Sequence, residues 1–279
     1  MAETLVTKEL SDRVGRVLGL NPGLMTGPGT NTYLVGRRDP ILIDTGAGVP
    51  EYFSHLHSYL DDHGIVSLRR VLLTHRHADH MGGVSSLRKE FHRLSVSKFV
   101  FRDSGLSKPV HAIKEGEVIE AEGATLVAIH TPGHSSDHLC YYLKEEKALF
   151  SGDLILGGST TVIPPGDGNL VQYMDSLRRL LDLDIERIYP GHGPVIEPAR
   201  AKIQEYIAHR LRRDQQILEA VSAGCHTIPE MVDRIYVDVS PSLHPMAQLS
   251  VHSHLIKLKA ERRVREEMAP NATSRWFLL

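Results

Sequence analysis

The chain has 279 residues, a formal net charge of −2 at pH 7, and 17 histidines. This length is enough to bury a core in one large domain, with or without a small appended domain. The composition, 41% hydrophobic and 24% charged, is typical of a soluble globular enzyme, and no apolar run approaches the roughly 20 residues that span a bilayer. We therefore expect no membrane span, whereas the near-zero charge neither predicts nor excludes an anionic partner.

Features that report the compartment are few. The first twenty residues contain acidic side chains and lack both the apolar core of a secretory signal and the Arg-rich character of a mitochondrial presequence. The two cysteines, Cys140 and Cys225, are far apart in sequence and do not indicate a disulfide framework. A cytoplasmic location is the default expectation. No segment requires a protein partner, and the sequence leaves the oligomeric state open.

The first two thirds of the chain alternate between short apolar runs and helical spacing. Strands are predicted over 13–20, 31–35, 41–43, 71–73, 124–129, 139–143, 148–150 and 188–189. Helices are predicted over 50–63, 84–91 and 172–183. The pattern occurs in two halves, which predicts an α+β fold in which two mixed sheets pack together between helices, four layers deep, over residues 1–198.

The composition changes at residue 199, where a long glycine-free stretch predicts a helix up to residue 222. Thr227-Ile-Pro-Glu230 then has the pattern of a capping box that opens another helix. A helix over 245–261 and strands over 264–268 and 275–278, joined by a polar turn at 270–272, complete the chain. We predict a winged-helix-like domain over residues 199–279.

The stretch Thr74-His-Arg-His-Ala-Asp-His80 follows the strand 71–73 and places three imidazoles and one carboxylate within six positions. These side chains are zinc ligands, and a His-x-His pair at a strand end can turn both rings toward one ion. Three later turns, each just past an apolar strand, add further donors. The complete set is His75, His77, Asp79, His80, His134, Asp153 and His192. Seven donors exceed one tetrahedral site but suit two ions about 3.5–4 Å apart that share a carboxylate and a water. The alternative is a set of unrelated histidines in turns.

In order, the motifs Thr-His-x-His-x-Asp-His, Thr-Pro-Gly-His, Ser-Gly-Asp and Pro-Gly-His resemble those of the metallo-β-lactamase superfamily of hydrolases over residues 13–198. Further segments make nearly the whole chain similar to the β-lactamase-like protein 2 group. They are Asn21-Pro-Gly, Gly29-Thr-Asn-Thr-Tyr, Ile43-Asp-Thr-Gly, Gly158-Ser-Thr-Thr-Val162 and Tyr189-Pro-Gly-His-Gly-Pro-Val. The resemblance implies an αββα sandwich with two zinc ions. It places His75, His77 and His134 on one ion, Asp79, His80 and His192 on the other, and Asp153 between them.

Two such ions lower the pKa of a bridging water, so that hydroxide is the expected nucleophile at neutral pH. Asp79 is expected to accept a hydrogen bond from this hydroxide, or to act as a ligand alone. Asp44, at the end of strand 41–43, is predicted to accept the second N–H of a ligating imidazole, and a turn cap is the alternative. The resemblance implies that Asn31, Thr160 and Thr161 face the site and hold a phosphate oxygen, with local turn bonding as the alternative.

The last helix carries two further histidines and a basic stripe. His252 and His254 stand two residues apart and point to different sides of a helix, so we assign them no metal. The stripe either guides a nucleic-acid backbone or is a solvated helix face. It comprises Lys257, Lys259, Arg262 and Arg263.

The resemblance implies a zinc-dependent endoribonuclease whose substrate is single-stranded RNA, and because that group has mitochondrial members, the mitochondrial matrix is a second possible location. The segment between Asp153 and His192 is too short for the large inserted domain that many nucleases of this fold use. The same seven ligands also serve thioester hydrolases of the glyoxalase II type or acting on acyl carrier substrates, which is the alternative. A binding module without catalysis would leave the intact ligand set unexplained.

Overall fold

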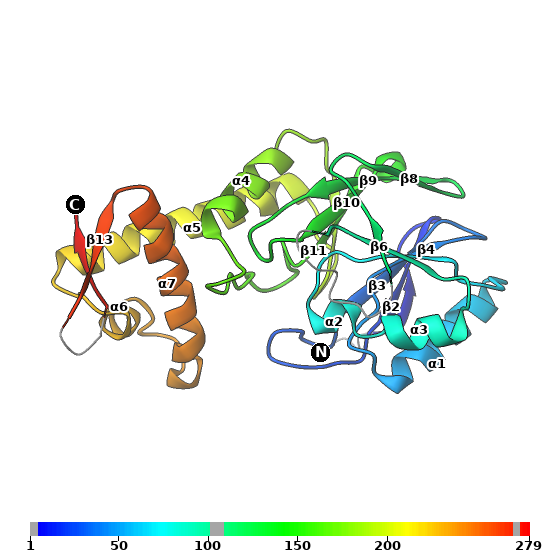
Figure 1. Cartoon of the computed structure of the whole chain (residues 1–279), viewed down its shortest axis with the longest axis horizontal. Coiled ribbons are helices and arrows are strands. Elements are labelled where there is room, and N and C mark those ends of the chain that lie inside the picture. Colours follow the sequence, from blue (N-terminus) through cyan, green and yellow to red (C-terminus); the bar gives the residue numbers. More distant parts are fainter. Residues whose placement is uncertain (1–4, 101–108, 270–273) are drawn as a thin grey trace.

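The computed structural model describes residues 5–100, 109–269 and 274–279, and the predicted turn at 270–272 lies outside these residues. Seven strands form the first sheet in chain order (Figure 1). They are β1 (Thr7–Glu9), β2 (Val14–Leu18), β3 (Asn31–Val35), β4 (Ile41–Ile43), β5 (Arg70–Leu72), β6 (Ser95–Lys98) and β7 (His111–Ala112). Pairing is antiparallel from β1 to β4 and parallel from β4 to β7.

The second sheet has five strands in the order β12-β11-β10-β9-β8. They are β8 (Val118–Ala121), β9 (Ala124–His130), β10 (Leu139–Leu143), β11 (Ala148–Gly152) and β12 (Arg187–Pro190). Strand β10 pairs antiparallel with both β9 and β11, and β11 pairs parallel with β12. Strands β9, β11 and β12 therefore run in one direction and end at the same edge of the sheet.

The two sheets pack face to face because alternate apolar residues of each point into one core. Tyr33 and Ile43 of the first sheet meet Leu126, Tyr141 and Phe150 of the second, all at most 2% exposed. The ring centroids of Tyr33 and Phe150 lie 5.2 Å apart in an edge-to-face arrangement. This core holds the strand ends of both sheets in fixed positions.

Helices cover both outer faces of this pair of sheets. Helices α1 (Pro50–Asp62) and α3 (Val84–Glu90) cover the first sheet, with the short α2 (Ala78–Met81) before α3. Helices α4 (Leu170–Leu180) and α5 (Ala199–Ser222) cover the second. The predicted four-layer αββα sandwich is confirmed. Helix α4 begins two residues before the prediction because Asn169 caps it, its Oδ1 accepting the N–H of Gln172 at 3.1 Å.

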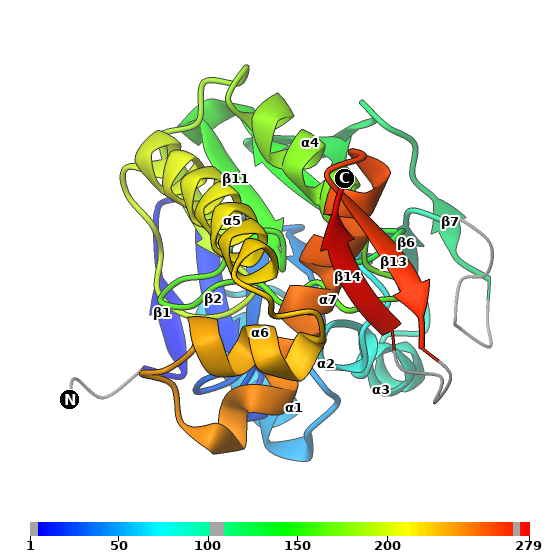
Figure 2. The ribbon, with the colours of Figure 1, turned by 90° about the vertical axis from the view of Figure 1, so that its left-hand side faces the viewer.

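The chain ends in a compact helical unit with a hairpin, at one end of the molecule (Figures 1 and 2). It contains α6 (Ile228–Ile235), a 3-10 turn (Pro241–Leu243), α7 (His244–Ala260), β13 (Val264–Met268) and β14 (Ser274–Leu278). A second 3-10 turn, Lys144–Glu146, lies between β10 and β11. The predicted winged-helix arrangement is confirmed, as is the capping box between Thr227 and Glu230. Trp276, 1% exposed, is at the centre of its core.

Helix α5 belongs to both parts of the molecule. Its first half, with Ile203 and Tyr206, packs in the core beside the second sheet, and its second half, with Ile217 and Val221, packs in the winged-helix core. A boundary at residue 198 stays a prediction, because the helix that begins there joins the two cores. No helix in the described part of the chain is long and apolar enough to cross a bilayer.

The packing between the sheets predicts the effect of shortening one core side chain. Replacing the fully buried Leu126 by Ala should lower the free energy of unfolding by about 2–5 kcal/mol, because it removes apolar contacts and leaves a cavity. Val118→Ala on β8, where the side chain is 51% exposed, should change it by less than about 0.5 kcal/mol. Urea unfolding followed by far-UV circular dichroism measures both, and equal losses would contradict this account of the core.

Candidate metal centre

Turns at the ends of four strands bring the seven candidate ligands together. His75 to His80 follow β5, and His134, Asp153 and His192 follow β9, β11 and β12. The side chains form three overlapping groups whose ligand atoms lie within 4.8 Å of one another. The groups are His75, His77 and His134; His75, His80 and Asp153; and Asp79, His80 and His192. The site thus occupies the edge at which both sheets end.

The first group directs three imidazole nitrogens at one point. His77 Nδ1 lies 2.9 Å from His75 Nε2 and 3.0 Å from His134 Nε2. The ring nitrogens on the far sides are held by the protein, because His75 Nδ1 is 3.0 Å from Thr74 Oγ1 and His134 Nδ1 is 2.8 Å from Val162 O. These outer contacts leave the inner nitrogens with their lone pairs toward the centre.

The second group combines two imidazoles with a carboxylate. His192 Nε2 lies 3.2 Å from Asp79 Oδ2 and 3.3 Å from His80 Nε2. Asp79 Oδ2 is 3.5 Å from His80 Nε2, and about 30% of the Asp79 side chain is exposed. This is the more open of the two carboxylates in the site.

Asp153 lies between the groups and offers one oxygen to each. Its Oδ1 is 3.3 Å from both His80 Nε2 and His192 Nε2. Its Oδ2 is 3.6 Å from His134 Nε2. One carboxylate can therefore serve two cations at once.

The donor set is one that a cation would satisfy. Burial lowers the pKa of His75 well below its usual value, and the neighbouring His80 and His134 lower it further, so this ring is neutral. Burial disfavours charge on Asp153 as well, but His80 and His192 outweigh it and hold the pKa of Asp153 well below its usual range. The neutral His75 ring and the ionised Asp153 carboxylate are already in the forms that bind metal ions, whereas His80 and His192, whose pKa values are raised by the nearby carboxylates, would release a proton to a bound cation. The residues present therefore fit a metal site.

Asp44 fixes the orientation of His80. Its Oδ2 accepts from His80 Nδ1 at 2.7 Å and from Thr74 Oγ1 at 2.8 Å, and its Oδ1 accepts from Thr74 N at 2.8 Å. Burial lowers the pKa of His80, but Asp153 and Asp44 outweigh it and raise the pKa above its usual value. His80 Nε2 consequently faces the site while Nδ1 is fixed behind it.

His138 is fully buried beside the cluster, but its nitrogens are engaged elsewhere. Its Nε2 accepts the backbone N–H of Asp153 at 3.1 Å, and its Nδ1 is 2.8 Å from Thr131 Oγ1. Burial and the nearby His134 lower its pKa, so the ring is neutral. His138 therefore supports the turn that carries Asp153 and leaves no free lone pair for a metal.

Asn31 and Thr161 are buried, and their polar groups bond the backbone of the site. Asn31 Nδ2 donates to Pro190 O and Gly193 O, both at 2.9 Å, on either side of His192. Thr161 Oγ1 donates to Asp153 O at 2.8 Å. The Asn31 bonds join segments far apart in sequence and are not local turn bonds. Thr160 is exposed and lines an adjoining cavity.

The glycine before His192 has a steric reason. A Cβ on Gly191 would lie 2.7 Å from Asp153 Oδ1 and 2.9 Å from His80 Cε1. Any larger residue would therefore push into the cluster. This explains the Pro-Gly-His turn without a special backbone angle.

A cavity of about 220 Å³ opens over the cluster, with His77, Asp79, His134, Asp153 and His192 at its base. Its walls include the apolar side chains Met25, Leu156, Val162 and Pro164. The sequence did not single out these residues, since apolar side chains in loops carry no ligand signal. The loop of Val162 was expected at the site through Thr160 and Thr161, whereas the apolar lining became apparent only from the fold.

Only Lys257 of the basic stripe is buried, whereas Lys259, Arg262 and Arg263 are exposed. Lys257 is 4% exposed and bonds Asp214 Oδ2 at 2.7 Å, and Lys259 bonds Glu266 Oε2 at 2.8 Å. His254 is 1% exposed and bonds Asp214, away from the metal cluster. The expectation of a solvated helix face is wrong for Lys257, because α7 buries that side against α5.

Comparisons with known proteins agree with this fold and site. The family model for the metallo-beta-lactamase superfamily matches residues 25–192, and that for the beta-lactamase associated winged helix domain matches residues 227–276. The chain belongs to the metallo-β-lactamase superfamily and is a member of its metal-dependent hydrolases.

Its relatives carry different names. The beta-lactamase-like protein 2 homolog of Caenorhabditis elegans is 41% identical over 238 residues, 83% of this chain and 79% of that protein. The atrochrysone carboxyl ACP thioesterase of Aspergillus chevalieri is 36% identical over 282 residues, 98% of this chain and 89% of that protein. The crystal structure of a beta-lactamase domain protein from Burkholderia ambifaria has a TM-score of 0.86 at 20% identity, covering 100% of this chain and 96% of that one, which shows the shared fold.

Replacing Asp44 by Asn tests its hold on His80. Asn tolerates the left-handed backbone at this position, where φ is 59°, but its amide cannot replace the carboxylate that accepts from both His80 and Thr74. We expect metal affinity to fall about 10- to 100-fold, as measured by competition with a chromophoric chelator. Asp61→Asn, an exposed carboxylate on α1, is the control. Equal affinity in the two variants would show that Asp44 does not position the ligand.

Proposed function

We propose that this hydrolase holds two zinc ions, one on each ligand group, with Asp153 shared between them. Two observations support the proposal. The groups His75, His77, His134 and Asp79, His80, His192 have no residue in common, and the two oxygens of Asp153 face different groups. Imidazole and carboxylate donors in this number suit zinc.

Zinc bound here would polarise the bond under attack and lower the pKa of water, which makes hydroxide accessible at neutral pH. The protein residues position these events. Asp153 is held ionised by His80 and His192, and its backbone is fixed by His138 and Thr161. Asp79 contributes Oδ2 to the second ligand group and is partly open to the cavity, so it can also accept a hydrogen bond from the attacking water.

The substrate that the site geometry favours is a thioester of an apolar acyl group. The observation that carries this proposal is the apolar wall above the metal cluster. The cavity over the cluster shares Met25, Leu156, Thr161 and Val162 with a second cavity of about 260 Å³ that runs between the sandwich and the winged-helix domain. The second cavity adds Ile163, Leu170, Val239, Leu243 and Met246 to the apolar lining. An acyl chain buries apolar surface along these side chains, which cannot replace the hydration of a ribose.

The names of relatives support the same class of substrate. A protein 36% identical over nearly the whole chain is named an acyl carrier protein thioesterase. A thioester carbonyl is also a suitable electrophile for a polarised site that delivers water, since the thiolate leaves without needing strong protonation.

Single-stranded RNA is the second candidate substrate. It is favoured by the resemblance to the β-lactamase-like protein 2 group and by two arginines, Arg210 and Arg213, that line the cavity between the domains. The basic stripe adds little support, because Lys257 is buried and Lys259 is paired, which leaves only the exposed Arg262 and Arg263. We therefore rank RNA cleavage below thioester hydrolysis.

Two single substitutions separate the metal positions. His77→Ala removes a donor of the first group only, and His192→Ala removes a donor of the second only. Each variant should retain about half of the metal of the unaltered protein after dialysis, and the double variant should retain little, as measured by mass spectrometry of the metal. His252→Ala, a half-buried histidine outside the cluster, should keep full loading. Full loading of either single variant would refute the two-site assignment.

A substrate panel tests the proposed reaction. Octanoyl-N-acetylcysteamine, S-lactoylglutathione, single-stranded RNA, duplex RNA and single-stranded DNA are incubated with the metal-loaded protein and with Asp153→Ala. We expect turnover of the octanoyl thioester to exceed that of the other substrates and to fall to background in the variant, which loses the shared carboxylate. RNA cleavage that depends on Asp153 and exceeds thioester turnover would reverse the order of the two proposals.

A further inference from the structure

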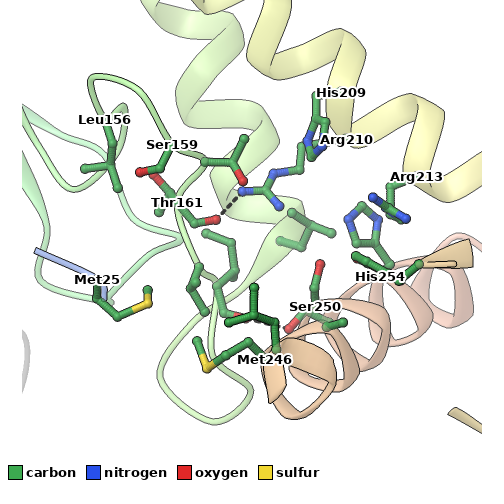
Figure 3. A pocket seen from close by; sticks show the side chains of 18 of the residues that line it. Met25, Leu156, Ser159, Thr161, His209, Arg210, Arg213, Met246, Ser250 and His254 are labelled. Carbon is green, nitrogen blue, oxygen red and sulfur yellow. Dashed lines mark hydrogen bonds between the residues drawn. The ribbon is translucent and has the colours of Figure 1, made fainter. Parts of the chain in front are cut away.

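The cavity between the domains has two chemically different ends (Figure 3). Met25 and Leu156 lie on the side that adjoins the metal cluster. Arg213 and His254, from helices α5 and α7, lie on the opposite side. The metal chemistry does not require anything at this second end, which is therefore unexplained by the site described above.

Four ring and guanidinium nitrogens at this end are buried without a hydrogen-bond partner in the described part of the chain. They are His209 Nδ1, Arg210 Nε, Arg213 Nη1 and His254 Nε2. Arg210 and His254 are 4% and 1% exposed, so solvent does not reach them readily. Because buried polar atoms without protein partners are rare and costly, four of them around one cavity offer unused hydrogen-bonding capacity to a polar ligand.

The charges at this end are also unbalanced. No carboxylate of residues 5–100, 109–269 or 274–279 forms an ion pair with Arg210 or Arg213, and the nearby Asp214 is already bonded by His254 at 2.6 Å and Lys257 at 2.7 Å. Burial lowers the pKa of His209 to about 4, and the adjacent Arg210 and Arg213 contribute to this shift. A buried cation without a counter-ion is unfavourable, so an anion would stabilise this cluster.

The cationic side chains are held in place before any ligand arrives. Arg210 donates from Nη2 to Thr161 O, the residue whose hydroxyl bonds the Asp153 turn. The Arg213 guanidinium stacks over the Tyr236 ring at 4.0 Å, and Asp214 fixes the His254 ring through Nδ1. Preorganised donors lose little conformational entropy on binding, as expected of a built binding site.

We propose that His209, Arg210, Arg213 and His254 form an oxyanion subsite that binds a carboxylate or phosphate group of the substrate. The apolar body of that substrate lies along Met25 and Leu156 and reaches the metal cluster. The two guanidinium groups donate to the anion, and His254 Nε2 donates once the anion has raised its proton affinity. Only the direction of the ligand toward the metal cluster rests on the proposed function, and the subsite itself rests on the cationic cluster.

Equilibrium binding to the full-length, metal-loaded protein tests this subsite without turnover, so a failure of thioester hydrolysis leaves the test intact. The probes are octanoate, octanol and inorganic phosphate, measured by isothermal titration calorimetry. We expect octanoate to bind at least tenfold more tightly than octanol. Arg213→Met should weaken octanoate at least tenfold and leave octanol unchanged, and Arg213→Lys should restore part of the loss.

Arg212→Met is the matched control, because it removes the same charge from the neighbouring, exposed position of α5. Octanoate binding should be unchanged in it, and the melting temperature of each variant shows that the fold is retained. Loss of phosphate binding in Arg213→Met alone would also support the subsite and would identify phosphate as its group. Equal effects of Arg212→Met and Arg213→Met, or octanoate binding that is lost in His77→Ala but kept in Arg213→Met, would overturn it.

Discussion

The arrangement depends on the turn that presents Asp153 between two groups of imidazoles. A buried carboxylate is costly unless positive or hydrogen-bonding groups surround it, and here His80 and His192 hold it ionised. Its backbone is fixed from both sides, since the N–H donates to His138 Nε2 and the carbonyl accepts from Thr161 Oγ1. Because these contacts hold the turn in place, one oxygen of the carboxylate faces each ligand group.

The two sheets give this turn its precision. The hydroxyl groups of two core tyrosines reach from one sheet to the other at the edge where the ligands lie. Tyr141 of the second sheet donates from its hydroxyl to Leu73 O, just before the His75 stretch, at 2.8 Å. Tyr33 of the first sheet donates to Pro190 O, just before His192, at 2.7 Å. Each sheet therefore positions ligands that belong to the other, so the ligand geometry and the packing between the sheets are coupled.

Much of the metal centre could be predicted from sequence, because ligand types and apolar strands leave local patterns. The ends of strands 71–73 and 148–150 locate His75 and Asp153. These strands lie in different sheets, so only the packing of the two sheets brings their ends together. The cavity could not be predicted. Arg213 has the spacing of a solvated helix residue, and Met25 is an apolar residue in a glycine-rich loop. Whether such side chains meet depends on how α5 and α7 pack, which short-range patterns do not specify. The expectation that Lys257 lies on a solvated helix face was wrong for the same reason.

The ligand set suits the hydrolysis of more than one kind of bond, so the choice of substrate must depend on the residues that surround it. Helix α5 is the physical link, since Tyr206 packs beside the second sheet and Arg210 and Arg213, one and two turns further, face the winged-helix domain. Arg210 also bonds Thr161, which holds the Asp153 turn. An anion that accepts a hydrogen bond from Arg210 would therefore contact a side chain that is linked to the Asp153 turn by two hydrogen bonds, through Thr161. Under the proposed function the winged-helix domain forms one wall of the substrate site, so that both domains contribute to one function.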